Sequence, residues 1–134
     1  MNAVDTNVLV YACDKRDPIR QSTARELLRT LTDGITLWQV ACEFIAASRK
    51  LAGQGFTPAE AWGRLAEYLD LFPMRLPTTQ VLERARAMHL NEQWSFWDAT
   101  LVAACREAGV TQLFSEDLPG RNPPAGLQIV NPFA

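Results

Sequence analysis

Short apolar segments alternate with amphipathic helical segments along the whole of this 134-residue chain, and this alternation constrains its fold more than any other feature. Strands that alternate with helices run parallel to one another, and the connecting helices pack on the faces of the sheet. The sequence therefore predicts an α/β fold of three layers, with a central parallel sheet and helices on both faces. The chain has the length of one domain, residues 1–134, without repeats or linkers.

Individual elements follow from periodicity and from capping residues. Val8–Tyr11 is expected to be a buried strand or a strand that turns into a helix. Pro73 restricts residues 72–76 to an edge strand or a strand start. Thr57, Pro58 and Glu60 form a strong helix start with a capping box. The expected strands are residues 1–4, 35–38, 72–76, 112–114 and 127–130; the expected helices are 22–31, 39–52, 58–71, 79–91 and 96–109; and the one clear loop is 118–126.

Composition excludes some classes of protein. The net charge of −2 gives no basic field, and it neither requires nor excludes a nucleic-acid partner. Nearly all basic residues are Arg, which suits phosphate binding, although a coding bias explains this more simply. Cys13, Cys42 and Cys105 lack metal-ligand spacing and are expected to be reduced core residues. No segment has the length of a membrane span and no signal peptide precedes the chain, so a cytoplasmic protein is expected.

Four carboxylates lie where an apolar residue or a strand end would be expected: Asp5, Glu43, Asp98 and Asp117. Asp5 and Asp117 follow expected strands, and α/β sheets bind ligands beyond the carboxyl ends of their strands. Glu43 and Asp98 lie early on helices that begin at the same edge, and both share a helix face with apolar residues. All four are therefore expected to converge at one edge of the sheet.

Convergent carboxylates repel one another unless a cation compensates them. Mg²⁺ or Mn²⁺ is the expected compensator, because hard cations prefer oxygen ligands and because metal-bound water is a source of nucleophile. Two ions are compatible with this many acids. A zinc site is not expected, since the cysteines are scattered and His89 is the only histidine. His89 is expected at the surface or boundary of its helix.

Each acid taken alone also has a structural interpretation. Asp5 could be the N-cap of a following helix, and Asp98 could form a capping box with Ser95. Asp117 could be a turn residue. Glu43 is the hardest to explain in this way, because it lies in mid-helix on an apolar face.

The same acids lie in four segments: V-D-T-N-V-L-V at 4–10, V-A-C-E-F at 40–44, W-D-A-T-L-V-A-A-C at 97–105 and S-E-D-L at 115–118. In order and spacing these segments resemble the PIN-domain family of metal-dependent ribonucleases, and most closely the small VapC toxins of bacterial toxin–antitoxin pairs. The resemblance covers essentially the whole chain. It implies a sheet of about five strands and a helix that begins soon after Asp5.

The resemblance also implies roles for the site residues. Asp5 and Asp98 would be the main metal ligands, and Glu43 and Asp117 would complete the acidic cluster directly or through water. Ser115 would bond to a ligand or a water. Which of Glu116 and Asp117 faces the metal is left open. The supporting candidates are Asn7, Ser115 and Glu116.

The leading hypothesis is a Mg²⁺- or Mn²⁺-dependent endoribonuclease that inhibits translation and is neutralised by a cognate antitoxin. The main alternative is a non-catalytic metal-binding interaction protein. A receiver-like phosphoacceptor is disfavoured because no lysine follows Lys50, and a haloacid-dehalogenase-type phosphatase is disfavoured because position 7 is Asn7 rather than Asp. The candidate RNA contacts are Lys15, Arg16, Arg49 and Lys50.

The expected partners are an RNA substrate, the antitoxin and a second copy of the chain, with no membrane association. The helices at 59–71 and 79–91 offer apolar residues for a homodimer, among them Trp62, Tyr68 and Leu69. Trp62 and Leu69 could equally be core residues.

Overall fold

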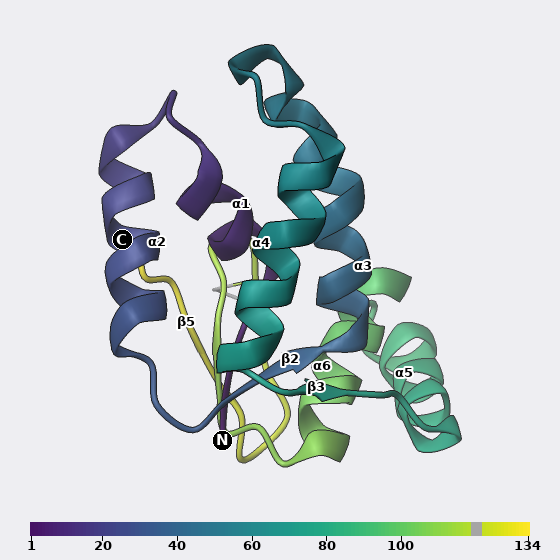
Figure 1. Ribbon diagram of the computed structural model, residues 1–134. Helices are drawn as coiled ribbons and strands as arrows, with labels where there is room; N and C mark the ends of the chain where they lie inside the picture. Colours follow the sequence, from purple (N-terminus) through teal and green to yellow (C-terminus); the bar gives the residue numbers. More distant parts are fainter. Residues whose placement is uncertain (119–121) are drawn as a thin grey trace.

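The computed structural model describes residues 1–118 and 122–134 and is built around a five-stranded sheet (Figure 1). All neighbouring strands pair in parallel, in the order β3-β2-β1-β4-β5. This architecture confirms the predicted α/β fold. The strands are β1 (Asn2–Val4), β2 (Gly34–Leu37), β3 (Met74–Arg75), β4 (Gln112–Phe114) and β5 (Gln128–Val130).

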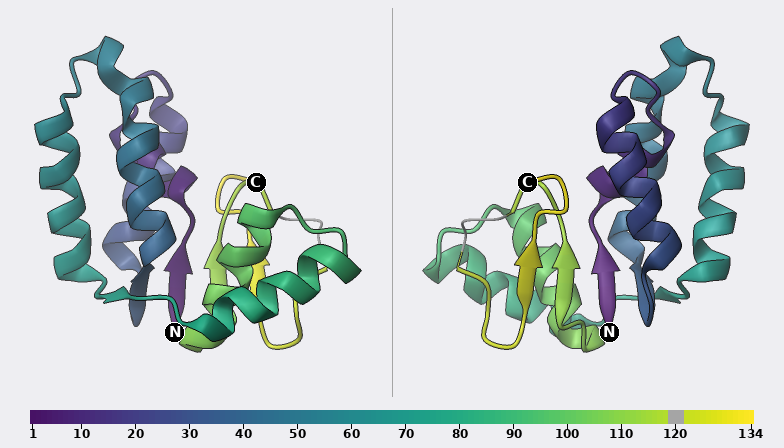
Figure 2. Two further views of the ribbon diagram at one scale, coloured as in Figure 1. Left: turned by 90° about the vertical axis from the view of Figure 1, so that its right-hand side faces the viewer. Right: turned by 90° about the vertical axis from the view of Figure 1, so that its left-hand side faces the viewer.

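The helices lie on both sides of this sheet. Figure 2 shows α5 and α6 on one side and α2 on the other, while the α3–α4 hairpin rises beyond the carboxyl ends of the strands. None of the helices in the described part of the chain is long and apolar enough to cross a membrane. The helices are α1 (Thr6–Cys13), α2 (Pro18–Thr30), α3 (Trp38–Ala47), the 3-10 helix η1 (Ser48–Gln54), α4 (Pro58–Leu71), α5 (Thr79–Asn91) and α6 (Phe96–Ala108).

The first strand is short because Asp5 caps a helix directly after it. The Asp5 carboxylate accepts a 2.7 Å hydrogen bond from Thr6 N, and Val8 N donates to Asp5 O at 3.1 Å. The strand interpretation of Val8–Tyr11 is therefore wrong, and the turn into a helix is correct. An apolar run at this place satisfies either structure, since α1 is buried along most of its length.

Two other helices differ from the prediction at their boundaries. The second helix begins at Pro18 rather than at Ser22, because Asp17 accepts a hydrogen bond from Arg20 N and proline is tolerated in a first helical turn. Trp38 opens α3 instead of ending a strand. The predicted 39–52 helix is α-helical only to Ala47 and continues as η1.

Several predicted boundaries are confirmed. Thr57 accepts a 3.1 Å hydrogen bond from Glu60 N, with Pro58 in the first turn, and Ser95 accepts from Asp98 N at 3.3 Å. The strand after Pro73 lies at the edge of the sheet. The predicted loop at 118–126 includes residues 119–121, which lie outside the described residues.

The core lies between the sheet and its helices, and two predictions about it need correction. Tyr68, expected to offer dimer surface, is 5% exposed: its ring packs edge-to-face on Phe44 and its hydroxyl donates to Leu9 O. Cys42, expected in the core, is exposed, whereas Cys13 and Cys105 are buried. Both errors concern which side of a helix meets a neighbouring helix, and that depends on the α3–α4 pairing. All three cysteines are free, as predicted.

Candidate active site

Parallel pairing of β1 and β4 brings Asp5 and Ser115 together at the carboxyl edge of the sheet. The register pairs Val4 with Phe114, and Asp5 N extends the ladder with a 2.8 Å hydrogen bond to Phe114 O. Ser115 Oγ then donates to Asp5 Oδ2 at 2.7 Å. Both side chains are almost completely buried. The first acid predicted from the sequence is thus held by a residue from the other end of the chain.

Asp5 is the most perturbed carboxyl group of this edge. Burial raises its pKa from 3.8 to about 6, and the negative charges of Glu43 and Asp117 act in the same direction. Hydrogen bonds from Ser115 and from Thr6 N partly oppose the rise. At neutral pH the Asp5 carboxylate is therefore ionised, but burial and the neighbouring negative charges make this ionised form costly in free energy. A nearby cation would offset that cost.

Asp117 is exposed and is tied to the same group by Asn7. The Asn7 amide Nδ2 donates to Asp117 Oδ2 at 3.1 Å and to Ser115 Oγ at 3.4 Å, and Asp117 N donates to Ser115 Oγ at 3.2 Å. The supporting residues Asn7 and Ser115 therefore join Asp5 to Asp117. The turn interpretation of Asp117 describes its backbone, while its carboxylate faces Asn7.

Glu43 reaches the site from the second turn of α3. Its Oε2 accepts a 2.9 Å hydrogen bond from Thr6 Oγ1, next to Asp5, and its Oε1 accepts a 2.7 Å bond from Gln39 Nε2. Both oxygens are thus fixed by uncharged donors, and no basic residue in the described part of the chain forms an ion pair with Glu43. This half-buried acid on an apolar helix remains uncompensated by protein charge.

Asp98 lies in the first turn of α6. Gln39 Nε2, which binds Glu43, also donates to Trp97 O at 3.1 Å, so one side chain links Glu43 to the residue before Asp98. The Asp98 carboxylate itself makes no hydrogen bond or ion pair with residues 1–118 or 122–134. The capping-box interpretation is confirmed for its backbone N–H and leaves the carboxylate unused.

Glu116 differs from its neighbour Asp117 because positive charge already compensates it. Arg20 Nη2 and Nε both donate to Glu116 Oε1, at 2.7 and 3.1 Å, and the Arg20 guanidinium lies over the Tyr11 ring. A hydrogen bond from Tyr11, assisted by Arg20, lowers the pKa of Glu116, and the same bond raises the pKa of Tyr11 to about 12. Asp117 is therefore the acid of this pair that is available to a ligand.

The donor chemistry of the site fits a hard divalent cation, although the site is not a closed cage. The described residues contain no group of three or more Asp, Glu, His or Cys side chains arranged to hold a metal ion. Mg²⁺ in proteins often binds through one or two carboxylates and keeps several waters, so it does not require a compact cluster of acids. The assignment of Asp5, Glu43, Asp98 and Asp117 as ligands remains a prediction.

Sequence reasoning overlooked two residues that organise these acids, Thr6 and Gln39. Both had a usable signal. Gln39 precedes Glu43 by four residues on one helix, a spacing at which side chains meet, and Thr6 directly follows the capping Asp5. The predicted RNA contacts lie on two other segments: Lys15 and Arg16 follow α1, and Arg49 and Lys50 lie on η1. The two segments are joined by a 2.6 Å hydrogen bond from Gln54 to Asp14.

Comparisons with known proteins agree with this fold. The sequence matches the PIN domain family over residues 3–118. A search of curated proteins finds no match. Among solved structures, the chain is similar to a toxin–antitoxin complex from Klebsiella pneumoniae, with a TM-score of 0.68 and 19% identity over 98% of both chains. It is also similar to VapC20 of Mycobacterium tuberculosis, a toxin described as cleaving the sarcin-ricin loop, with a TM-score of 0.69 and 22% identity over 87% of this chain and 92% of that one.

At these identities the two solved structures show a shared fold, while the match of the sequence to the family model covers most of the chain. PIN-domain nucleases generally use divalent metal ions. The chain belongs to the PIN domain family.

Proposed function

We propose that this protein is a divalent-metal-dependent endoribonuclease, a VapC-type toxin that hydrolyses RNA phosphodiester bonds, inhibits translation and is neutralised by a cognate antitoxin. The observation that carries the proposal is the buried Asp5 carboxylate, flanked by the charges of Glu43 and Asp117 at the carboxyl edge of the sheet. Membership of the PIN domain family and the likeness to VapC-type structures support it. They do not favour a non-catalytic metal-binding interaction protein.

In this proposal Asp5, Glu43, Asp98 and Asp117 hold Mg²⁺ or Mn²⁺, directly or through water. When bound, the ion would supply an activated water and would offset the charge that develops on the phosphoryl oxygens.

The surrounding residues orient the acids. Ser115 and Thr6 N direct one hydrogen bond to each oxygen of Asp5 and favour its ionised form. Thr6 and Gln39 fix the two oxygens of Glu43, and Asn7 fixes Asp117. None of these donors carries a charge that would compete with a cation.

The partners extend the proposal. RNA would bind across the carboxyl edge of the sheet, with Lys15, Arg16, Arg49 and Lys50 as candidate phosphate contacts; Arg16 is already paired with Asp14. The antitoxin is proposed from the toxin–antitoxin complex among the similar structures. Exposed apolar side chains on α4 and α5 are the proposed homodimer surface, and the cytoplasm is the proposed compartment. Of the side chains predicted for this surface, Trp62 is 60% exposed.

The decisive experiment measures cleavage of a mixed RNA pool by the purified protein with added Mg²⁺ or Mn²⁺, with EDTA, and by Asp5→Asn. Cleavage is expected only for the unmodified protein with metal. Asp70→Asn, at an exposed position of α4, is the matched control and should cleave at the normal rate. Cleavage that persists in excess EDTA, or in Asp5→Asn, would refute the assignment. Sequencing the 5′ ends of the products would then identify the substrate and the cleavage site.

A further inference from the structure

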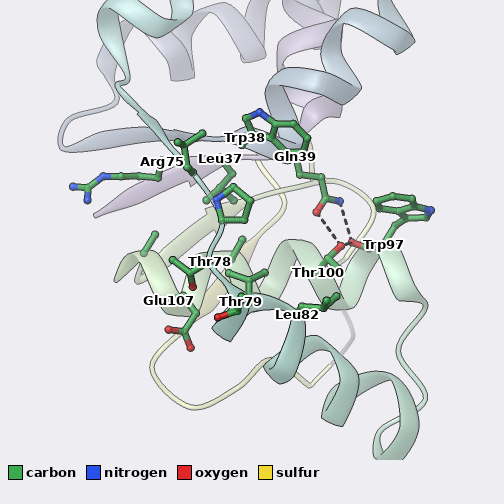
Figure 3. A pocket seen from close by; sticks show the side chains of 15 residues that line it. Leu37, Trp38, Gln39, Arg75, Thr78, Thr79, Leu82, Trp97, Thr100 and Glu107 are labelled. Atoms are coloured by element: carbon green, nitrogen blue, oxygen red, sulfur yellow. Dashed lines mark hydrogen bonds between the residues drawn. The ribbon is translucent and has the colours of Figure 1, made fainter.

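A pocket of about 620 Å³ opens next to the candidate active site, between the start of α3, the segment after β3, α5 and α6 (Figure 3). Its volume is typical of sites that bind small molecules or cofactors. Most of the lining is apolar, and two partly exposed tryptophans belong to it: Trp38 is 46% exposed and Trp97 is 66% exposed. Large apolar side chains left open to solvent in a concave site indicate a ligand that covers them.

One polar side chain of the pocket also belongs to the acidic group. Gln39 lines the pocket, accepts a 2.9 Å hydrogen bond from Thr100 Oγ1, and donates to Trp97 O and to Glu43 Oε1. Figure 3 shows Gln39 directed between Thr100 and Trp97. A single side chain therefore separates an occupant of this pocket from Glu43, one of the four candidate metal ligands.

The two ends of the pocket differ in character. At one end the Trp97 ring packs edge-to-face against Phe96, with ring centroids 5.0 Å apart. At the opposite end lies Arg75, which forms no ion pair with any residue that the structure describes; its Nη2 donates a hydrogen bond to Met1 Sδ. The pocket thus offers a flat apolar surface near the acids and a free positive charge further away.

We propose that this pocket binds one unpaired base of the RNA strand next to the cleaved phosphodiester, with Trp97 as the stacking surface; this inference rests on the proposed function. A nucleotide complements both ends of the pocket, because its base has a flat π-face that can stack on tryptophan and its phosphate can pair with arginine. An unpaired base can enter such a pocket without the free-energy cost of breaking a base pair. A second copy of the chain is the competing occupant, but it gives no reason for the link through Gln39 or for the unpaired Arg75.

The first test measures binding of a short single-stranded RNA in EDTA, so that no metal-dependent cleavage takes place. Trp97→Ala should weaken binding by about 5- to 100-fold, the range expected when one stacked base is lost, and Trp97→Phe should restore most of the affinity. Ile19→Ala is the control, because Ile19 is 81% exposed on α2 and does not line this pocket. Equal affinities of the Trp97→Ala and Ile19→Ala variants would overturn the proposal.

The second test replaces single nucleotides of the same RNA by abasic ones. One position should lower the affinity of the unmodified protein several-fold and should have no further effect on Trp97→Ala. If no abasic position lowers the affinity of the unmodified protein, or if Trp97→Ala changes only the oligomeric state, no base occupies the pocket.

These outcomes are separable from the proposed function. Base-dependent binding without any cleavage would refute the proposed nuclease activity and leave the assignment of the pocket as a base-binding site intact. Metal-dependent cleavage without base-dependent binding would refute only the assignment of the pocket.

Discussion

Ser115 Oγ donates a 2.7 Å hydrogen bond to Asp5 Oδ2, although 110 positions separate the two residues in the chain. The bond exists because β1 and β4 are neighbours in register and each places one residue just beyond its carboxyl end. It favours the ionised form of Asp5 in surroundings where burial opposes ionisation. Ser115 therefore has a measurable influence on the charge state of the site.

Removing the Ser115 hydroxyl should move the pH dependence of RNA cleavage. Metal binding requires ionised Asp5, so cleavage is expected to decline as the pH falls through about 6, the raised pKa of Asp5. Ser115→Ala removes an interaction that lowers this pKa, so the decline should begin at a higher pH. Ser115→Thr retains a hydroxyl and should preserve the profile. The measurement is kcat/KM against pH, and identical profiles for serine and alanine would contradict the prediction.

Asp5→Asn should stabilise the metal-free protein at neutral pH. The folded-state pKa of Asp5 lies above its unfolded value of 3.8, so the folded protein binds more protons between pH 3.8 and about 6. Stability therefore falls as the pH rises through this window, by roughly 3 kcal/mol for two pKa units. Asparagine carries no charge and avoids this loss. Urea unfolding in EDTA at pH 7.5 should show Asp5→Asn to be more stable by about 2–3 kcal/mol.

At pH 3.5 the advantage of Asp5→Asn should be nearly absent, because the wild-type carboxyl group is protonated in both states. A variant that is less stable than wild type at pH 7.5 would show that burial of the Asp5 charge is not the dominant effect.

Asp117 and Glu116 should differ strongly in their importance for cleavage. Glu116 is paired with Arg20 and hydrogen-bonded to Tyr11, whereas Asp117 is exposed and contacts only uncharged donors among the described residues. Asp117→Asn is expected to lower kcat/KM by about 10- to 100-fold, and Glu116→Gln by only a few-fold. Single-turnover cleavage by the two variants is the measurement. A larger loss for Glu116→Gln would assign the ligand role to Glu116.

The inner strand β4 should be sensitive to loss of core volume. Leu113 is completely buried in β4, between β1 and β5. Leu113→Ala is expected to destabilise the fold by about 2–5 kcal/mol, through lost apolar burial and the cavity that remains. Leu71→Ala on α4 makes the same chemical change at a side chain that is 64% exposed, and it should shift stability by less than about 0.5 kcal/mol. Thermal unfolding of both variants distinguishes the two environments.

Much of the fold could be predicted from local signals. The helix starts at Thr57 and Ser95 follow from capping chemistry, and the edge position of β3 follows from Pro73, which cannot donate a ladder hydrogen bond. Errors arose where a local pattern suits two structures. Val8–Tyr11 is apolar enough for a buried strand or a buried helix, and only the cap at Asp5 decides between them.

Other errors concern how helices pair. Tyr68 is a core residue and Cys42 is exposed, because α3 and α4 meet each other at particular angles that no single helix specifies. The amphipathic pattern predicts that a helix has a buried face, but the width of that face depends on its neighbours.

The sequence by itself determined the layered α/β architecture, since alternating strand and helix patterns leave few other ways to bury both. It also determined that acids follow strand ends or begin helices. Only the tertiary structure decided how these acids interact: Ser115 binds Asp5, Gln39 links Glu43 to the start of α6, and Arg20 neutralises Glu116. The reason is physical, because a hydrogen bond between distant residues depends on strand register and helix packing to within an ångström or so, whereas sequence patterns specify only which face or edge a residue occupies.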